Sequence, residues 1–174
     1  MLKGSRVAVR PFELTDVEDY FAYAHLKQAT LPAGMTPLKS QAAALEHIRR
    51  FAREKQDLAL VYRQHVVGNI GVYPRDLSPL TGDDMTREIG YIPHPHFWHR
   101  GFMTEGLQLV IDDQFHNGIQ AVWAGVFPEN IASINLLQRL GFDFQFEVPL
   151  PRGLTPDQPR NERYYRLLPN QFEK

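Results

Sequence analysis

The sequence predicts one mixed α/β domain over residues 1–174. Segments with strand-like and helix-like patterns follow the order β-α-α-β-β-β-α-β-α-β-β, and two strand-to-helix junctions follow each other closely within residues 86–142. The chain has 174 residues, of which 43% are hydrophobic and 22% are charged, so it can bury one sizeable core. No internal repeat or low-complexity tract interrupts this organisation.

The chain is expected to begin with a strand followed by two helices. Residues 6–10 alternate polar and apolar side chains and stop at a proline, which is typical of a short strand. Thr15 and Glu18 have the spacing of a capping box, in which each side chain accepts a hydrogen bond from an otherwise unpaired backbone N–H. Residues 28–39 contain two prolines and a glycine and are expected to form a loop before a helix over residues 40–53.

The rest of the chain alternates strands with two further helices. A hairpin is expected first, and Gly68 inside its second strand indicates a bulge or close packing. The predicted helices cover residues 104–117 and 130–140. The predicted strands cover residues 57–63, 65–73, 87–92, 121–127, 142–148 and 162–168.

Composition and charge exclude several classes of protein. The formal net charge of −1 argues against a nucleic-acid binder, which usually carries an excess of basic residues. Because the chain contains no cysteine, it has no disulfide, thiol nucleophile or thiolate metal site, and this fits a reducing compartment. No apolar run approaches the length of a membrane span, and the N-terminus lacks a signal-peptide core. We therefore expect a soluble, cytoplasmic protein without a membrane partner.

The loop over residues 98–104 is the first candidate for a binding site. It connects a strand to a helix, and converging N–H groups at a helix N-terminus attract phosphates. Gly101 would let the backbone approach a ligand closely, and His99 and Arg100 could add charged contacts. The alternative is that Gly101 only serves a tight turn and that Arg100 is solvated. The loop is neither a Walker A loop nor a dinucleotide fingerprint, because the required glycines and lysine are missing.

Four motifs stand out along the chain: Arg87–Tyr91, Pro95–Gly106, Pro128–Ser133 and Leu140–Phe142. Together they resemble the GNAT N-acetyltransferase superfamily, and in particular its ribosomal-protein Ser/Ala N-terminal acetyltransferase branch, the RimJ/RimL type. They stand in the order and at the spacing of that superfamily. The N-terminal residues 9–12 and 15–16 also match the way this branch begins, so the resemblance spans nearly the whole chain.

The resemblance implies the GNAT fold and a cleft for acetyl-CoA. In this fold a central mixed sheet, flanked by helices, opens between its fourth and fifth strands, here residues 87–92 and 121–127. The cofactor-binding residues that the resemblance implies are Tyr91, Ile92 and Pro93 along the pantetheine arm, His99, Arg100, Gly101, Phe102, Met103 and Thr104 around the pyrophosphate, and Asn130 at the start of the next helix. Met103 stands where the family usually has a glycine or an alanine.

The resemblance also implies a reaction and two catalytic residues. An amine attacks the thioester carbonyl directly, which requires a base, donors for the developing oxyanion and an acid for the thiolate. Glu88 is the candidate base, because family members often place a carboxylate on this strand. Ser133 is the candidate acid, because this branch often uses a serine there, and Leu137 stands where many relatives have a tyrosine acid. The alternatives are that Glu88 only pairs with Arg87 or another cation, and that Ser133 only adds to the hydrogen bonding of its helix's first turn.

Pro93 stands where the family commonly offers a backbone N–H to the thioester carbonyl, and proline has none. Oxyanion stabilisation must therefore come from a neighbour or be weaker. The expected activity is an acetyl-CoA-dependent N-acetyltransferase acting on a primary amine, either a protein N-terminus or a small molecule. The alternative is a catalytically weak acyl-CoA-binding regulator on the same fold. Because related proteins are often dimers, the resemblance is also compatible with a homodimer.

A metal-dependent hydrolase is a third and weaker hypothesis. His94, His96 and His99 are close in sequence, but their spacing matches no known ligand set and no carboxylate stands among them. We therefore predict no metal site. Phe97 and Trp98 lie between these histidines, and both are expected to pack in the core.

Overall fold

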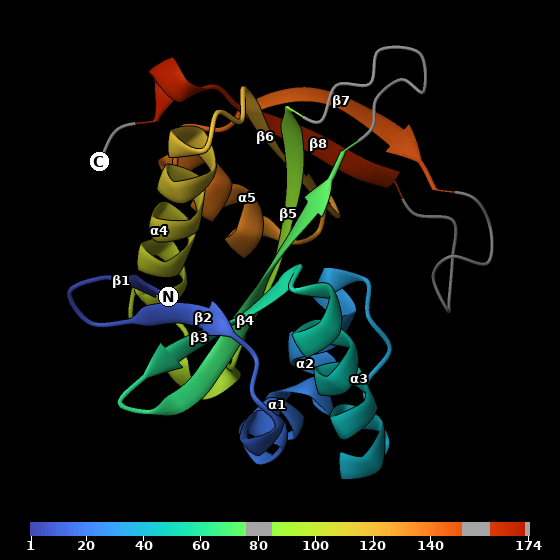
Figure 1. The fold of residues 1–174 in the computed structure, drawn as a ribbon. Coiled ribbons are helices and arrows are strands. Elements are labelled where there is room, and N and C mark those ends of the chain that lie inside the picture. Colours follow the sequence, from blue (N-terminus) through green and yellow to red (C-terminus); the bar gives the residue numbers. More distant parts are fainter. Residues whose placement is uncertain (76–84, 151–160, 173–174) are drawn as a thin grey trace. The chain divides into compact units, whose positions relative to one another are not determined.

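The computed structural model describes residues 1–75, 85–150 and 161–172, and its described part has the predicted mixed α/β fold. One eight-stranded sheet runs in the order β1-β2-β3-β4-β5-β6-β8-β7 (Figure 1). Its strands are β1 (Leu2–Lys3), β2 (Ala8–Pro11), β3 (Asp57–Tyr62), β4 (His65–Pro74), β5 (Thr86–Pro93), β6 (Ala121–Val126), β7 (Asp143–Pro149) and β8 (Asn161–Leu167).

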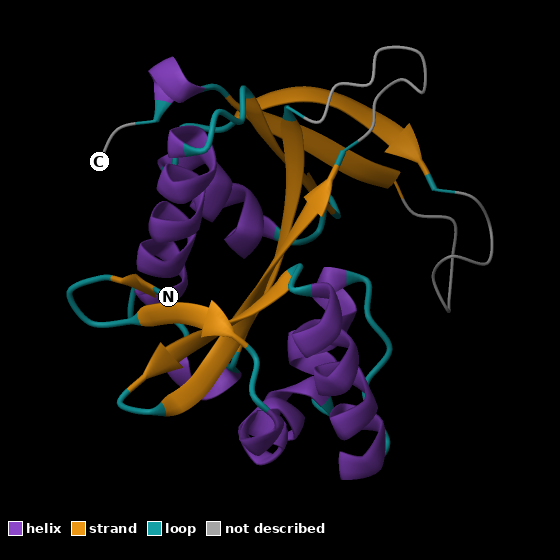
Figure 2. Cartoon of the chain, viewed as in Figure 1, coloured by secondary structure: helices purple, strands orange, loops and turns teal. Residues whose placement is uncertain are grey.

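Helices accompany the strands along the chain (Figure 2). They are α1 (Val17–Ala24), α2 (Lys27–Thr30), α3 (Gln41–Glu54), α4 (Phe102–His116) and α5 (Ile131–Arg139), with short 3-10 turns at Leu14–Asp16, Leu31–Ala33, Pro95–Phe97 and Pro169–Gln171. Among the residues described, no helix is both long and apolar enough to cross a membrane.

The chain folds into two compact units. The first contains residues 1–72 and 90–113, and the second contains residues 73–89 and 114–174. The single domain expected over residues 1–174 stays a prediction.

Aromatic side chains form the core beneath α1 and α3 in the first unit. The largest members of this cluster are Phe12, Tyr20, Tyr23, Ile48 and Phe51. The centroids of its rings lie 5.2–5.6 Å apart, in edge-on and tilted contacts that stabilise aromatic pairs.

Ser40 caps α3 as predicted, because its Oγ accepts a hydrogen bond from the Ala43 N–H at 3.2 Å.

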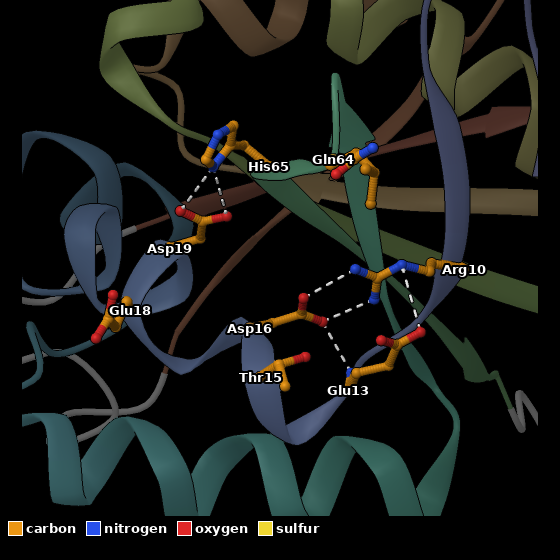
Figure 3. A pocket seen from close by; sticks show the side chains of 9 residues that line it. Arg10, Glu13, Thr15, Asp16, Glu18, Asp19, Gln64 and His65 are labelled. Atoms are coloured by element: carbon orange, nitrogen blue, oxygen red, sulfur yellow. Dashed lines mark hydrogen bonds and ion pairs between the residues drawn. The ribbon is translucent and has the colours of Figure 1, made fainter.

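The predicted capping box at Thr15 and Glu18 is wrong. Asp16 instead accepts the Glu13 N–H at 2.8 Å, and a 3-10 turn precedes α1. Figure 3 shows why Asp16 takes this role: the Arg10 guanidinium on β2 donates to both of its carboxylate oxygens, at 2.7 and 2.8 Å. This ion pair raises the pKa of Arg10 above its ordinary value, chiefly through the hydrogen bond to Asp16. The ion pair therefore ties β2 to the start of α1.

Figure 3 also shows the pocket around this ion pair, which His65 and Asp19 border on another side. His65 Nδ1 lies 3.3 Å from a carboxylate oxygen of Asp19, and the same carboxylate accepts the Val66 N–H at 2.8 Å. The acidic residues that line this pocket either pair with groups of the chain, as Asp16 and Asp19 do, or are exposed to solvent.

The bulge predicted near Gly68 is confirmed. In the β3–β4 hairpin, Leu60 faces Gly68 and Val61 faces Val66, so Val67 is an extra residue in β4. A Cβ at Gly68 would lie 2.6 Å from the Ile92 carbonyl oxygen, so only glycine permits this approach to the end of β5. The backbone here is therefore packed as closely as its atoms allow.

The second unit contains a parallel strand pair with a short ladder. β5 and β6 pair over three residues, Thr86–Glu88 with Ala121–Trp123, although both strands continue further. A ladder that ends this early is the arrangement expected of strands that separate. β8 pairs antiparallel with β6 and with β7. Tyr165 on β8 is buried, at 3% exposure.

Several boundaries differ from the prediction. The sequence pattern missed β1, because two residues are too short for a detectable period. Residues 28–39 contain most of α2 and a 3-10 turn, where a loop was expected. The helix α4 begins at Phe102 rather than at residue 104.

Replacing Gly68 by alanine is expected to destabilise the protein by about 1–3 kcal/mol, because the new methyl group must displace the backbone of β5. Urea unfolding followed by circular dichroism measures this change. Gly90→Ala is the matched control on β5, since a Cβ there meets no atom within 4 Å. We expect Gly90→Ala to be neutral or to stabilise by under about 1 kcal/mol. Equal stability of the two variants would contradict the close approach at Gly68.

Candidate active site

The loop that precedes α4 has an unusual backbone. His99 and Gly101 adopt left-handed conformations, with φ of 58° and 75°. A non-glycine residue with positive φ is uncommon, and such residues cluster at functional sites. Gly101 begins the helix, because its carbonyl accepts the Glu105 N–H at 3.0 Å. The first N–H groups of α4 have no acceptor within the helix, and the exposed turn at residues 99–101 lies directly before them.

The Glu105 carboxylate ties this helix start to the N-terminal segment of the same unit. It accepts hydrogen bonds from the Arg6 N–H at 2.8 Å, the Arg6 Nε at 2.8 Å and the Ser5 Oγ at 3.1 Å. Arg6 also donates from Nη1 to the Arg100 carbonyl at 2.9 Å. Burial by itself raises the pKa of Glu105, but the hydrogen bonds from Arg6, Val7 and Ser5 outweigh it and lower that pKa.

Aromatic side chains at the ends of the loop pack against neighbouring rings. Phe102 packs on Tyr62 of β3 with ring centroids 4.4 Å apart, and Phe97 lies 6.2 Å from Phe102. Met103 is only 8% exposed, and a Cβ at Gly68 would lie 3.2 Å from its terminal methyl. The large Met103 side chain therefore points into the core and leaves the loop's outer face to the backbone.

The end of β5 offers no free backbone N–H at residues 93 and 94. Pro93 has no N–H, and the N–H of the next residue, His94, donates to the Val67 carbonyl at 2.9 Å. Trp98 donates from its indole nitrogen to the Pro93 carbonyl at 3.1 Å. The prediction that Trp98 packs in the core is wrong, since Trp98 is 37% exposed and its indole N–H is hydrogen-bonded to the backbone.

The three neighbouring histidines differ in environment. His94 is buried and its Nδ1 accepts the His96 N–H at 3.1 Å, while His96 and His99 are exposed. Burial lowers the pKa of His94, so its ring is neutral near pH 7. Within residues 1–75, 85–150 and 161–172, no three His, Asp or Glu side chains are grouped so as to hold a metal ion.

Glu88, on β5 in the second unit, forms an ion pair with Arg75. Arg87, the other cation considered for Glu88, donates from Nη1 to the Thr86 carbonyl at 2.9 Å. Burial raises the pKa of Glu88, and the ion pair with Arg75 opposes this effect. Glu88 therefore does pair with a cation, Arg75, and its role as a base stays a prediction.

Asn130 and Ser133 meet at the start of α5. Asn130 caps the helix, and its Oδ1 accepts the Ser133 N–H at 3.2 Å. Leu137, one turn later, is 1% exposed and has no group that could move a proton. The catalytic role of Ser133 and the cofactor contact of Asn130 stay predictions.

The predicted site residues fall into both units. Tyr91, Ile92, Pro93 and the His99–Thr104 loop belong to the first, and the second contains Glu88, Asn130 and Ser133. Sequence reasoning missed Arg75 and Trp123, and no local signal indicates where Arg75 lies. The alternation along residues 162–168 did predict that one of Tyr164 and Tyr165 faces the core, and Tyr165 is the buried one.

Residues 6–143 match the family model described as the acetyltransferase (GNAT) domain. A sequence relative is the "Probable N-acetyltransferase YjcK" of Bacillus subtilis (strain 168), which is 26% identical over 156 residues and aligns with 82% of this chain and 83% of its own.

Solved structures share the fold at lower identity. An acetyltransferase of the GNAT family from Bacillus anthracis has a TM-score of 0.84 and 19% identity, over 96% of this chain and 97% of that one. The microcin C7 self-immunity acetyltransferase MccE, solved with acetyl-CoA and AMP, has a TM-score of 0.78 and 14% identity, over 95% and 93%. A ribosomal-protein-alanine N-acetyltransferase from Brucella melitensis has a TM-score of 0.74 and 17% identity, over 92% and 99%.

Replacing Glu105 by glutamine is expected to cost about 1–3 kcal/mol of stability at pH 7, because the charged acceptor of several hydrogen bonds is lost. The folded-state pKa of Glu105 lies below its ordinary value of 4.5, so its stabilisation is present above pH 4.5 and is lost as the pH falls through the folded-state pKa. Urea unfolding between pH 7 and pH 3 measures both effects.

The matched control is Glu46→Gln in the exposed i,i+3 pair with Arg49, where a change under about 1 kcal/mol is expected. A difference between wild type and Glu105→Gln that stays constant down to pH 3 would contradict the role of the ionised carboxylate.

Proposed function

The chain belongs to the GNAT acetyltransferase family, and we propose that it transfers the acetyl group of acetyl-CoA directly to a primary amine, without a covalent enzyme intermediate. The observation that carries this proposal is the loop before α4, where His99 and Gly101 turn the backbone through left-handed conformations into a helix N-terminus. MccE, which has the same fold, was solved with acetyl-CoA, and this supports the choice of co-substrate.

The loop suits a pyrophosphate for three physical reasons. Its N–H groups and the helix dipole favour negative charge, and Arg100 is exposed beside them. A Cβ at Gly101 would lie 3.2 Å from the Arg6 guanidinium, so a side chain there would crowd the turn. We therefore propose that His99, Arg100, Gly101, Phe102, Met103 and Thr104 bind the pyrophosphate through the loop backbone, and that Tyr91, Ile92, Pro93 and Asn130 contact the pantetheine arm.

The amine must lose a proton before or during its attack on the thioester carbon. Glu88 is proposed as the base, acting directly or through water, because burial raises its pKa towards the range in which a carboxylate accepts protons efficiently. The new C–N bond forms as the C–S bond breaks. Ser133, at the start of α5, is proposed to give a proton to the departing thiolate.

The reaction also needs a donor for the oxygen that becomes negative. In this chain Pro93 has no N–H, and the His94 N–H is bound to Val67. We propose that this donor comes from another group in the cleft and that oxyanion stabilisation is weaker than is usual for the family. The same observation favours the second candidate, a catalytically weak acyl-CoA-binding regulator.

For the acceptor we propose a protein N-terminus or a small primary amine. The motifs of the RimJ/RimL branch favour an N-terminus, and the fold that this chain shares with a ribosomal-protein-alanine N-acetyltransferase supports that branch. A homodimer is the proposed oligomer, because related proteins are often dimers.

Release of coenzyme A thiol from acetyl-CoA, measured against a panel of N-terminal peptides and small amines, tests the activity. We expect release to depend on the amine and acetylated amine to accumulate in equal amount. Thiol release without any amine would indicate hydrolysis. Tight binding of coenzyme A with no thiol release would establish the regulator instead.

Glu88→Gln is expected to lower kcat/KM by about 10²–10⁴-fold if Glu88 is the base. The apparent pH optimum should rise as well, because the amine must then arrive already deprotonated. Glu147→Gln on β7 is the control, since Glu147 is exposed and paired with Arg163. An unchanged pH profile in Glu88→Gln would remove Glu88 from the mechanism.

A further inference from the structure

Arg75, just after β4 in the second unit, is enclosed by aromatic rings. Its guanidinium carbon lies 4.6 Å from the Trp123 ring centroid and 4.5 Å from the Tyr164 ring centroid. Its side chain is only 11% exposed, although arginine is rarely buried without a partner. The partner is Glu88, which forms an ion pair with Nη1.

The surroundings of Arg75 hold it in one orientation. The Arg75 N–H donates to the Thr86 carbonyl at 3.3 Å, and the Thr86 hydroxyl donates to the Arg75 carbonyl at 2.6 Å. Phe146 packs against the Trp123 and Tyr164 rings, with centroid distances of 6.0 and 5.3 Å. The backbone of Arg75 is therefore fixed at Thr86, two residues before Glu88 on β5, and its guanidinium is held between two packed rings.

This cluster also contains polar groups that ordinary packing does not explain. The Arg75 Nε and the Trp123 Nε1 are buried and have no hydrogen-bond acceptor among the described residues. Native proteins leave few buried donors unsatisfied, and those that remain require a functional or structural reason.

We propose that Arg75 is a positioning residue for the acetyl transfer, whose guanidinium, clamped between Trp123 and Tyr164, orients the Glu88 carboxylate and favours its ionised form. The inference rests on the proposed function, because it assumes that Glu88 is the base. It assigns Arg75 a role through Glu88 and no contact with the reacting atoms. Arginine suits this role because its planar guanidinium can stack on aromatic rings and still donate to a carboxylate, whereas a lysine ammonium is a point charge with no plane to stack.

The charged groups around Glu88 determine the direction of the expected effect. Burial raises the pKa of Glu88, Arg75 lowers it, and Glu162 of β8 raises it. Tyr164 is neutral, because burial and its hydrogen bond to Glu162 raise its pKa. Arg166 of β8 lies over the Trp123 ring, 5.6 Å from its centroid. Without Arg75, the burial of Glu88 and the nearby Glu162 carboxylate both favour protonation of Glu88.

The test compares Arg75→Met, Arg75→Lys and a control, Arg163→Met, which removes an arginine of the same unit from an exposed pair with Glu147. Two quantities are measured for each variant: the pH profile of kcat/KM, and the titration of the Glu88 carboxyl by carbon NMR. The second measurement needs no turnover, so it reports on the ion pair even if the proposed reaction is wrong.

In Arg75→Met we expect the acid limb of the rate profile and the Glu88 titration to move together to higher pH by on the order of one unit. In Arg75→Lys the limb should stay near its wild-type position while kcat falls, because the charge is kept and the alignment is lost. Arg163→Met should change neither quantity.

An unchanged Glu88 titration in Arg75→Met overturns the inference, whatever the activity. A Glu88 titration that moves while the rate profile keeps its shape overturns the catalytic part of it. If the wild-type protein acetylates no amine, the proposed function is wrong. The titration of Glu88 then shows separately whether Arg75 controls the ionisation of Glu88. If Arg75→Met does not fold, Arg75→Lys decides the question: a wild-type kcat in that variant overturns the alignment.

Discussion

The contact between Glu105 and Arg6 is the constraint on which the proposed cofactor loop depends. A left-handed turn at His99 is strained, and it persists only if the surrounding structure holds it. Glu105 accepts the Arg6 backbone and side-chain donors, and the same Arg6 side chain donates to the Arg100 carbonyl inside the turn. One ion pair thus joins segments far apart in sequence and shapes the first turn of α4.

The chemistry of the second unit depends on a balance at Glu88. Burial alone would protonate this carboxyl at a higher pH, and a fully compensating cation would make it too weak a base. Arg75 opposes the effect of burial, and the pKa of Glu88 still lies above its ordinary value. In the first unit, Pro93 has no N–H and the His94 N–H is bound to the Val67 carbonyl, so neither is free to donate to a developing oxyanion.

Sequence reasoning succeeded where the signal is local. Gly68 marked a bulge because a glycine in the middle of a strand has no side chain to pack there, and Ser40 marked a helix start because its cap needs only the next three residues. It failed at Thr15 and Glu18, since Asp16 is recruited by Arg10 from a neighbouring strand. It missed Arg75 for the same reason: its partners Glu88, Trp123 and Tyr164 come from three strands, and no periodic pattern reports such a meeting.

Calorimetric titration with coenzyme A and with pantetheine tests whether the loop before α4 binds the pyrophosphate. Pantetheine carries the thiol arm without the pyrophosphate or the nucleotide. If the loop binds the pyrophosphate, coenzyme A should bind at least about 100-fold more tightly than pantetheine, which corresponds to roughly 2.7 kcal/mol. Added salt should weaken the binding of coenzyme A and leave the binding of pantetheine unchanged. Equal affinities for the two molecules, or no binding of coenzyme A, would contradict the account.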